Sequence, residues 1–336
     1  MWHDGEARDE GNDIRRVFVT GGAGFIGSHV AEGLLRQGAQ LFVMDCLDDF
    51  YSQARKRANL SEIEKVGGFE FLEADICDES AVRAAVLKFQ PDSVVHLAAR
   101  AGVRPSILQP ALYERVNVAG TLNLLEAARS AGVRKFVFGS SSSVYGESGN
   151  VPFCESEVQM RPISPYAATK QAGELLCYTY AHLHGLPSIC LRFFTVFGPR
   201  QRPDLAIHKF VALIEAGCPI PVFGDGSSGR DYTYVEDIVG GVLAALEYEV
   251  KEKVAFDVFN LGNSHPVKLG ELIEEIEAAT GKSAVRETQP MQPGDVTLTW
   301  ADISKAQARL GYKPQTSLSQ GLERFVSWYR ANREVE

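Results

Sequence analysis

Residues 16–29 read RVFVTGGAGFIGSH, and this stretch decides the fold. Its first part, Arg16–Thr20, is a short apolar run typical of a buried strand. Three closely spaced glycines follow, namely Gly21, Gly24 and Gly27. A periodic apolar segment then predicts a helix over Ile26–Gln37 that ends at Gly38. Glycines between a strand and a helix let the backbone turn tightly and approach a pyrophosphate, whose charge the helix N-terminus stabilises. The stretch therefore predicts a dinucleotide-binding unit.

The next predicted strand, Leu41–Asp45, separates this motif from an ordinary glycine-rich turn. Asp45 ends that strand 18 residues after Gly27, where a carboxylate accepts a hydrogen bond from a ribose 2′-hydroxyl. The same charge repels a 2′-phosphate, which favours NAD over NADP. Asp75 and Ile76 follow another strand and are expected beside the adenine, although Asp75 could instead cap the following helix.

The rest of the first half alternates apolar runs with helical patterns. Further buried strands are predicted at Phe69–Glu73, Ser93–Leu97 and Lys135–Ser140, and helices at Lys56–Lys65 and Val116–Ala131. Such alternation predicts an α/β protein with a doubly wound parallel sheet of the Rossmann type.

Prolines and glycines after about residue 190 mark loops, and helical patterns recur among them. These helices are predicted at Leu205–Glu215, Val235–Glu247, Leu269–Thr280 and Leu318–Arg330. We therefore expect a disordered acidic tail over residues 1–15 and an NAD-binding Rossmann domain over 16–190. Residues 191–330 should form a smaller α/β region, interwoven with the first domain, that binds the substrate.

Composition limits the classes of function. The 336 residues include 34 Lys+Arg and 43 Asp+Glu, a net charge of −9, and 45% are hydrophobic. That apolar content supports a sizeable core, and the acidic balance argues against binding nucleic acid or an anionic membrane. No apolar run reaches the roughly 18 residues of a membrane span. The six cysteines are scattered without metal-ligand spacing, so we expect reduced thiols, no metal site and a cytoplasmic protein.

Tyr166 and Lys170 are candidates for acid–base chemistry. They lie four residues apart on a predicted helix that starts after Pro165, so they share one face. A phenol with a pKa near 10 is a weak base at neutral pH, but a nearby ammonium and a cationic nicotinamide would favour the phenolate. Such a pair is common by chance, and two surface residues are the ordinary alternative. The serines at 140–143 strengthen the prediction, because they end a strand of a doubly wound sheet, where ligands bind.

Six motifs of this chain resemble, in the same order, those of the extended short-chain dehydrogenases/reductases. Within that family the chain resembles the group of nucleotide-sugar epimerases and dehydratases. The six motifs are TGGAGFIGSH (20–29), HLAA (96–99), SSSSVYG (140–146), YAATK (166–170), LRFFTVFGP (191–199) and GRDYTYVEDI (229–238). The resemblance spans Arg16 to about Arg330. It implies NAD as cofactor and three catalytic residues: Ser141, Tyr166 and Lys170. It also implies that NAD contacts Gly21, Gly24, Phe25, Ile26, Gly27, Asp45, Asp75, Ile76, Leu97, Ala98, Ala99, Asn117, Tyr166, Lys170 and Phe194.

The mechanism implied by this resemblance leaves NAD unchanged overall. Tyr166 would remove the proton of a sugar 4-hydroxyl while carbon 4 gives a hydride to NAD. Ser141 would hydrogen-bond the developing oxyanion. The 4-keto sugar would then turn over and take the hydride back on its other face, an isomerisation.

The residue types at positions 142 and 143, both serine here, distinguish the enzyme classes within this group. Dehydratases and uronate decarboxylases carry a carboxylic side chain here, and serines supply no acid or base at neutral pH; a loop that tolerates small polar residues is the alternative reading. The segments AARAGVR (98–104) and RPDLA (202–206) resemble UDP-glucuronate 4-epimerases. The substrate contacts implied are Arg104, Ser106, Ser142, Ser143, Thr195, Arg202, Val222, Arg230 and Asp295. Arg104 and Arg230 could instead be solvated surface charges, and Val222 part of a core edge strand.

The resemblance thus implies conversion between UDP-glucuronate and UDP-galacturonate by a homodimer that pairs the helices at Val116–Ala131 and Tyr166–His184. Three alternatives remain: a 4-epimerase of neutral UDP-sugars, a decarboxylase or dehydratase, and a catalytically idle NAD-binding scaffold. An intact Ser141, Tyr166 and Lys170 set argues against the scaffold, because mere binding needs no activated phenol.

Overall fold

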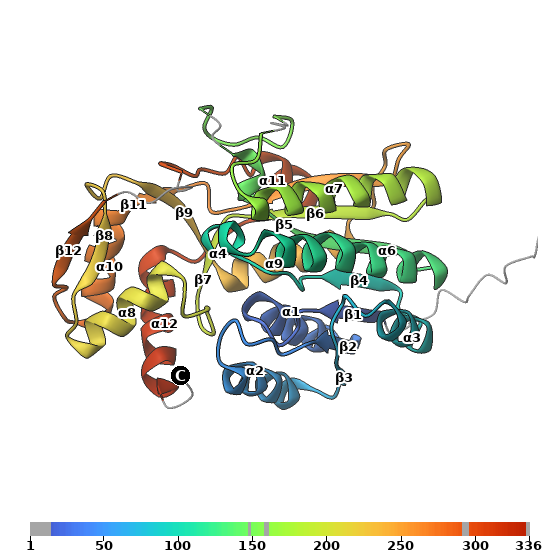
Figure 1. Cartoon of the computed structure of the whole chain (residues 1–336), viewed down its shortest axis with the longest axis horizontal. Helices are drawn as coiled ribbons and strands as arrows, with labels where there is room; N and C mark the ends of the chain where they lie inside the picture. Colours follow the sequence, from blue (N-terminus) through green and yellow to red (C-terminus); the bar gives the residue numbers. More distant parts are fainter. Residues whose placement is uncertain (1–14, 147–148, 158–160, 291–295, 334–336) are drawn as a thin grey trace, which may run out of the picture.

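A central sheet of seven parallel strands organises the chain (Figure 1). The computed structural model describes residues 15–146, 149–157, 161–290 and 296–333. The strand order is β10-β6-β5-β4-β1-β2-β3, and every neighbouring pair is parallel. The strands are β1 Arg16–Thr20, β2 Gln40–Asp45, β3 Glu70–Glu73, β4 Ser93–His96, β5 Lys135–Ser141, β6 Ser188–Phe193 and β10 Phe256–Leu261. The strand order reverses between β1 and β4, so the predicted Rossmann-type sheet is confirmed and its ligand crevice lies there.

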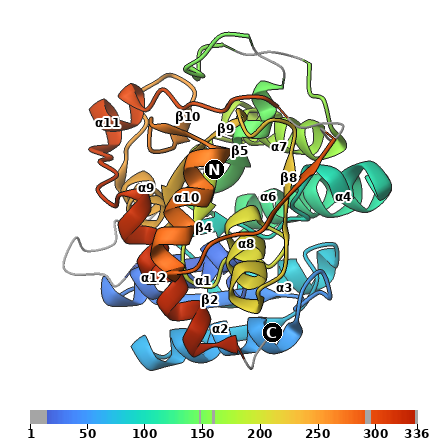
Figure 2. The same cartoon turned by 90° about the vertical axis from the view of Figure 1, so that its left-hand side faces the viewer.

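Helices cover both faces of this sheet (Figures 1 and 2). One face carries α1 (Phe25–Arg36) with its neighbour α2 (Gln53–Val66), and also α9 (Val235–Glu247). The other carries α3 (Glu79–Phe89), α6 (Gly120–Ser130) and α7 (Pro165–His184). In β1 the side chains of Val17 and Val19 pack toward the first set and Phe18 toward the second. Because both faces are buried, the inner strands read as continuous apolar runs.

Two predicted elements differ from the structure. Phe69–Glu73 was expected to be buried, but β3 is a largely exposed edge strand. Among the described residues β3 pairs with β2 alone, and the charges of Glu70 and Glu73 suit an edge strand. The helix predicted over Val116–Ala131 is α6 preceded by α5 (Pro110–Glu114) and a π-helical turn, η1 (Arg115–Ala119).

The remaining strands build two small sheets beside the large one. One contains β11 (Pro266–Lys268), β9 (Gly229–Tyr234) and β7 (Thr195–Phe197), and the other pairs β12 (Arg286–Gln289) with β8 (Ile220–Phe223). The other helices are α4 Val103–Leu108, α8 Ala206–Ala216, α10 Leu269–Thr280, α11 Ser304–Leu310, α12 Leu318–Ala331 and the 3₁₀ turn η2 Ser142–Tyr145. The boundary expected near residue 190 falls inside β6, and the later elements α9 and β10 pack on or belong to the large sheet.

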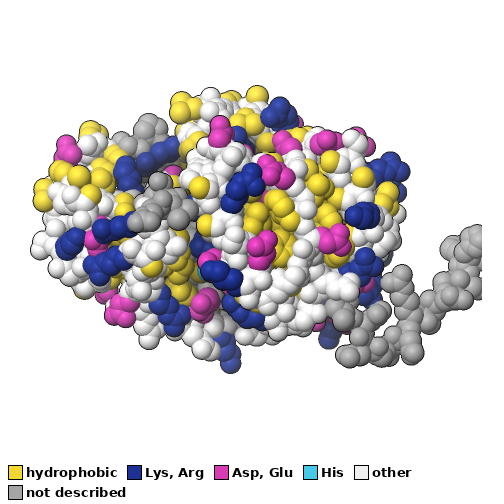
Figure 3. Space-filling view, turned by 90° about the horizontal axis from the view of Figure 1, so that it is seen from below, with side chains coloured by type: hydrophobic (Ala, Val, Ile, Leu, Met, Phe, Trp, Pro, Cys, Tyr) yellow, Lys and Arg dark blue, Asp and Glu magenta, His cyan; other side chains and the backbone are white. Residues whose placement is uncertain are grey.

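Several general features complete the fold. All six cysteines are free thiols. No described helix combines the length and apolar character needed to cross a membrane, and the described residues contain no metal-ligating cluster of three or more side chains. On the face shown in Figure 3, basic and acidic side chains are interspersed. The tail predicted over residues 1–15 lies outside the described residues except for Arg15.

Candidate active site

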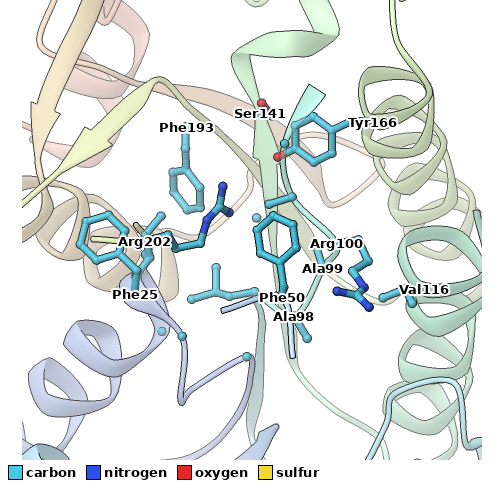
Figure 4. Close-up of a pocket in the computed structure, with 18 of the residues that line it drawn as sticks. Phe25, Phe50, Ala98, Ala99, Arg100, Val116, Ser141, Tyr166, Phe193 and Arg202 are labelled. Atoms are coloured by element: carbon cyan, nitrogen blue, oxygen red, sulfur yellow. The ribbon is translucent and has the colours of Figure 1, made fainter. Parts of the chain in front are cut away.

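A cleft of about 490 Å³ opens at the carboxyl ends of the central strands (Figure 4). Its walls come from the β1–α1 turn, the ends of β2, β4 and β5, the start of α7 and the segment that joins β6 to α8. Every residue expected to contact NAD lines this cleft except Asn117. The residues Ser141, Tyr166 and Lys170 line the same cleft.

The glycine-rich turn has the shape that a pyrophosphate needs. Gly21 has a φ of 73°, and a Cβ there would lie 2.6 Å from the Ala98 nitrogen. A Cβ on Gly27 would collide with the Gly21 carbonyl oxygen. Helix α1 begins without a side-chain cap, so the amide groups of its first turn remain available to an anion. The chain therefore fits a dinucleotide at this end of the cleft.

Two aspartates mark the expected adenosine end. Asp45 accepts hydrogen bonds from the Ala23 and Leu47 amides at 3.0 and 2.9 Å, and burial raises its pKa. A carboxylate can accept about four hydrogen bonds, so acceptor capacity remains for ribose hydroxyls. Asp75 does not cap α3, because Asp78 accepts from the Ala81 amide at 3.0 Å and caps that helix instead. Asp75 is thereby left to line the cleft.

Asn117 lies behind the cleft wall. Its side chain accepts from the Arg100 amide at 2.8 Å and donates to the Arg100 carbonyl at 3.0 Å. It also donates to the Thr169 hydroxyl at 3.0 Å. Asn117 therefore holds the segment after β4, which itself lines the cleft.

Tyr166 stands at the start of α7 with its hydroxyl turned toward Ser141 at the end of β5 (Figure 4). Ser164 caps the helix by accepting from the Ala167 amide at 3.1 Å, and Pro165 occupies the first helical position; both residues favour a helix start. Burial raises the pKa of Tyr166, while the Ser141 hydrogen bond and the Arg202 charge lower it. The site thus contains groups that favour the phenolate.

Lys170 lies one turn further along α7. Its Nζ donates to the Gly139 carbonyl at 2.6 Å and lies 4.9 Å from the centre of the Phe138 ring. Burial lowers its pKa to about 8. Tyr166 and Lys170 both line the cleft, and the charge of Arg202 lowers the pKa of Tyr166 against the larger effect of burial.

A buried ion pair that the sequence analysis missed supports this wall. Arg192 on β6 donates to both oxygens of Glu174 on α7, at 2.9 and 2.8 Å. The Ser140 hydroxyl donates to the same carboxylate at 2.5 Å. The pair ties α7 to β5 and β6. Glu174 also raises the pKa of Lys170 by its charge, against the larger effect of burial.

The substrate side of the cleft contains four of the predicted residues: Ser142, Ser143, Thr195 and Arg202. Arg202 binds Asp204 through two hydrogen bonds of 2.9 Å. Its guanidinium lies 5.4 Å from the centre of the Phe50 ring, and that of Arg100 lies 6.0 Å from the same ring. Figure 4 shows Phe50 between the two arginines.

The β2–α2 connection that carries Phe50 was missed from sequence. Asp48, Phe50, Tyr51 and Lys56 all line the cleft, and Lys56 donates to the Asp48 carboxylate at 2.8 Å. One signal was available, because these residues closely follow Asp45 at the carboxyl end of a parallel strand, where ligands bind.

Four predicted substrate contacts lie outside the cleft. The Arg104 guanidinium lies 5.2 Å from the centre of the Phe223 ring on β8, and Val222 packs against the core. Ser106 is buried and donates to the Val103 carbonyl at 2.5 Å. Arg230 donates to its neighbour's carbonyl, that of Gly229, at 2.9 Å. Asp295 lies outside the described residues.

The chain is similar to known proteins over most of its length. Residues 18–325 match the model of the family described as GDP-mannose 4,6 dehydratase. The UDP-glucuronate 4-epimerase of Thermodesulfobacterium geofontis is 43% identical over 319 residues, which are 94% of this chain and 97% of that protein. A probable UDP-glucuronate 4-epimerase of Rhizobium meliloti is 37% identical and covers 94% and 97% of the two chains.

Solved structures are similar over the same length. The UDP-glucuronic acid 4-epimerase of Bacillus cereus, crystallised with UDP-glucuronic acid and NAD, has a TM-score of 0.86 and 37% identity, with 94% and 99% of the two chains covered. The UDP-glucose 4-epimerase of Thermotoga maritima with UDP-glucose has a TM-score of 0.87 and 34% identity, over 95% and 99%. With its sheet, glycine-rich turn and Ser–Tyr–Lys site, the chain belongs to the GDP-mannose 4,6 dehydratase family of extended short-chain dehydrogenases/reductases.

Proposed function

We propose that this protein is an NAD-dependent UDP-glucuronate 4-epimerase that interconverts UDP-glucuronate and UDP-galacturonate. One observation carries the proposal. Ser141 and Tyr166 line the same cleft as the glycine-rich turn and as a wall of neutral hydroxyl groups, which come from Ser142, Ser143 and Thr195. The relatives described above include UDP-glucuronate 4-epimerases at 43% and 37% identity.

NAD, when bound, supplies the hydride acceptor and later the hydride donor, and its oxidised ring adds a positive charge. Tyr166 removes the proton of the sugar 4-hydroxyl; burial raises its pKa, and the Ser141 hydrogen bond and the Arg202 charge oppose that rise. Ser141 then donates to the 4-oxygen as its negative charge develops. Lys170, held by the Gly139 carbonyl, keeps a positive charge at the cofactor end of the site. When the turned sugar is reduced, Tyr166 returns the proton.

The wall formed by Ser142, Ser143 and Thr195 supports a uronate substrate. The 4-keto form of a uronate is a β-keto acid, which loses carbon dioxide readily. An epimerase must therefore hold the carboxylate in an orientation that does not favour this loss. Three hydroxyls donate hydrogen bonds to a carboxylate without offering an acid or a base.

The first experiment incubates the purified protein with UDP-glucuronate, without added NAD, and follows products by NMR. UDP-galacturonate is the expected product. Formation of UDP-xylose would indicate a decarboxylase, and conversion of UDP-glucose alone a neutral-sugar epimerase. No product from either sugar would favour an idle scaffold. Tyr166→Phe is the matched control, since it removes only the proton-transferring hydroxyl.

A double substitution tests the hydroxyl wall. Ser142→Ala/Thr195→Ala should weaken UDP-glucuronate binding by at least about tenfold, because each hydrogen bond to a charged group contributes about 1.5–3 kcal/mol, and should increase release of the 4-keto pentose. The measurements are calorimetric binding and product analysis. Unchanged affinity without more by-product would exclude this role.

We further propose a homodimer and a cytoplasmic location. Helices α6 and α7 expose large apolar side chains, namely Leu122, Leu175, Tyr178 and Leu183, and such an exposed apolar set suits a second copy of the chain.

The cytoplasmic location is supported by the cysteines, because six free thiols fit a reducing compartment. Fractionation of the source cells, with the protein followed by antibody, tests the location.

A further inference from the structure

The turn that precedes Arg202 is built around an arginine in an unusual backbone conformation. Arg200 has a φ of 66°, in the left-handed region that favours glycine. Within the same turn the Gln201 amide donates to the Gly198 carbonyl at 3.1 Å, and the Gln201 side chain donates to the Val196 carbonyl at 3.0 Å. Residues with a Cβ are disfavoured at this φ. The presence of arginine at position 200, where glycine would fit better, therefore suggests that its side chain has a role.

That side chain reaches α1, the helix of the glycine-rich turn. The Arg200 guanidinium forms an ion pair with Glu32, and the two side chains are 11% and 7% exposed. It also donates to the Ser28 hydroxyl at 3.2 Å. Beside it, His29 Nε2 donates to the Pro199 carbonyl at 3.0 Å, and burial and the Arg200 charge lower the pKa of His29 to about 3. Neutral His29 therefore donates over the physiological pH range.

These contacts connect two sides of the cleft. Helix α1 begins at the proposed pyrophosphate site, and Arg202 lies two residues beyond Arg200 on the substrate side. Arg202 has its own partners, Asp204 and Phe50, but its backbone position depends on the turn. Since a charge pair is buried only at a desolvation cost and the backbone of Arg200 is disfavoured as well, the pair is better explained by what it positions than by stability.

We propose that the Arg200–Glu32 ion pair is a positioning device that docks the 198–202 turn on α1 and thereby holds Arg202 where it binds the nucleotide sugar. Arg200 and Glu32 are positioning residues, which act through Arg202. The identity of the ligand rests on the proposed function, whereas the docking of the turn does not.

The test compares Arg200→Gly and Glu32→Gln with a matched control, Arg36→Gln. Arg200→Gly removes the guanidinium and also the unfavourable backbone, because glycine adopts this φ freely. Glu32→Gln leaves the backbone of the turn unchanged. Arg36 pairs with the same carboxylate at 2.8 Å, but from the surface, where its side chain is 61% exposed.

Amide hydrogen exchange measures how firmly the 198–202 turn is docked on α1, and it needs no ligand. Amides at 198–205 should exchange about tenfold faster in Arg200→Gly and Glu32→Gln, because local opening becomes easier, and should be unchanged in Arg36→Gln. Equal exchange in all three variants and the unsubstituted protein would overturn the proposal, whatever the substrate is.

Calorimetry in a Tyr166→Phe background then measures the affinity for UDP-glucuronate without turnover. Arg200→Gly should raise the Kd for UDP-glucuronate about tenfold, with KM rising similarly and kcat little changed in the active enzyme. In an Arg202→Ala background the same change should add no further loss, because coupled residues are not additive. Full additivity would contradict an action through Arg202. If the Tyr166→Phe protein carrying no other change fails to bind UDP-glucuronate, the proposed function is wrong, and the exchange data still decide the docking.

Discussion

Individual side chains in the cleft show how burial changes acid–base chemistry. Lys170 is buried, and its pKa falls to about 8 because the charged form is poorly solvated. Tyr166 is subject to the same effect in the opposite sense, and burial raises its pKa. The unfolded chain therefore holds a proton on Lys170 more tightly than the folded one does.

Lys170→Met should abolish epimerisation and leave the fold at least as stable. The lowered pKa corresponds to a cost of about 3 kcal/mol at neutral pH, partly offset by the lost hydrogen bond to Gly139. Between pH 8 and the unfolded value near 10.5 the unfolded state binds more protons, so the stability of the unsubstituted protein should rise with pH there, and that of the variant should not. Urea unfolding across this range provides the measurement. Lys209→Met, at an exposed position on α8, is the control, and a clearly less stable Lys170→Met protein would contradict the argument.

At the scale of elements, a buried histidine joins three of them. His96 at the end of β4 contacts the hydroxyls of Thr20 on β1 and Thr121 on α6, at 2.7 and 2.9 Å. Thr121 already donates to the Asn117 carbonyl at 2.6 Å, so His96 Nε2 donates to Thr121 and Nδ1 accepts from Thr20. This arrangement requires a neutral ring, and burial lowers the His96 pKa to about 3.

The consequence is a loss of stability in acid. Below pH 6.5 the unfolded histidine takes up a proton that the folded one refuses, so stability falls as pH falls. Between pH 7.5 and 5.0 the loss due to His96 should be about 2 kcal/mol. His96→Gln keeps a donor and an acceptor without titrating, so its pH dependence should be weaker by that amount in urea unfolding at the two pH values. Parallel pH profiles for the two proteins would refute the assignment.

At the scale of the whole molecule, the substrate-side helices are tied together by charge. Glu215 at the end of α8 pairs with Lys282 after α10 and with Arg330 on α12, at 2.7 and 2.6 Å. Burial alone would raise the pKa of Glu215, but these two cations and Arg333 together lower it to about 2. Helices α6 and α7 differ in character, since they leave large apolar side chains exposed.

If this apolar face joins two copies, charge placed on it should separate them. The unsubstituted protein should sediment at about twice 36.8 kDa, and Leu175→Glu/Leu183→Glu near the monomer mass, because a buried unpaired carboxylate opposes association. Leu183 is 65% exposed and Val285, between α10 and β12, is 59% exposed, so Val285→Glu controls for added charge. A monomeric unsubstituted protein, or a dimer that survives the double substitution, would exclude this interface.

Local patterns were enough to predict most of the sheet and the proposed cofactor site. Strand and helix periods predicted the elements, and the glycines at 21, 24 and 27 predicted a tight turn, in which a Cβ on Gly21 or Gly27 would collide with backbone atoms. Because the carboxyl ends of parallel strands meet at one edge, the sequence predicted that Asp45 and the serines at 140–143 lie at one crevice, and the family resemblance implied that Ser141 and Tyr166 act together there. The exposure of β3 and the π-helical turn before α6 could not be predicted in this way. Each depends on contacts with residues that are distant in the sequence.

Only the tertiary structure decided how the catalytic groups are supported. The charge of Arg202 acts on Tyr166, Phe50 lies between two arginines, and Arg200 forms an ion pair with Glu32 on α1. Each depends on residues far apart in the chain, which leave no periodic signal in the sequence. Secondary structure and the glycine turn follow from steric rules that act within a few residues. Electrostatic partners depend on burial and distance, and these exist only once the chain has folded.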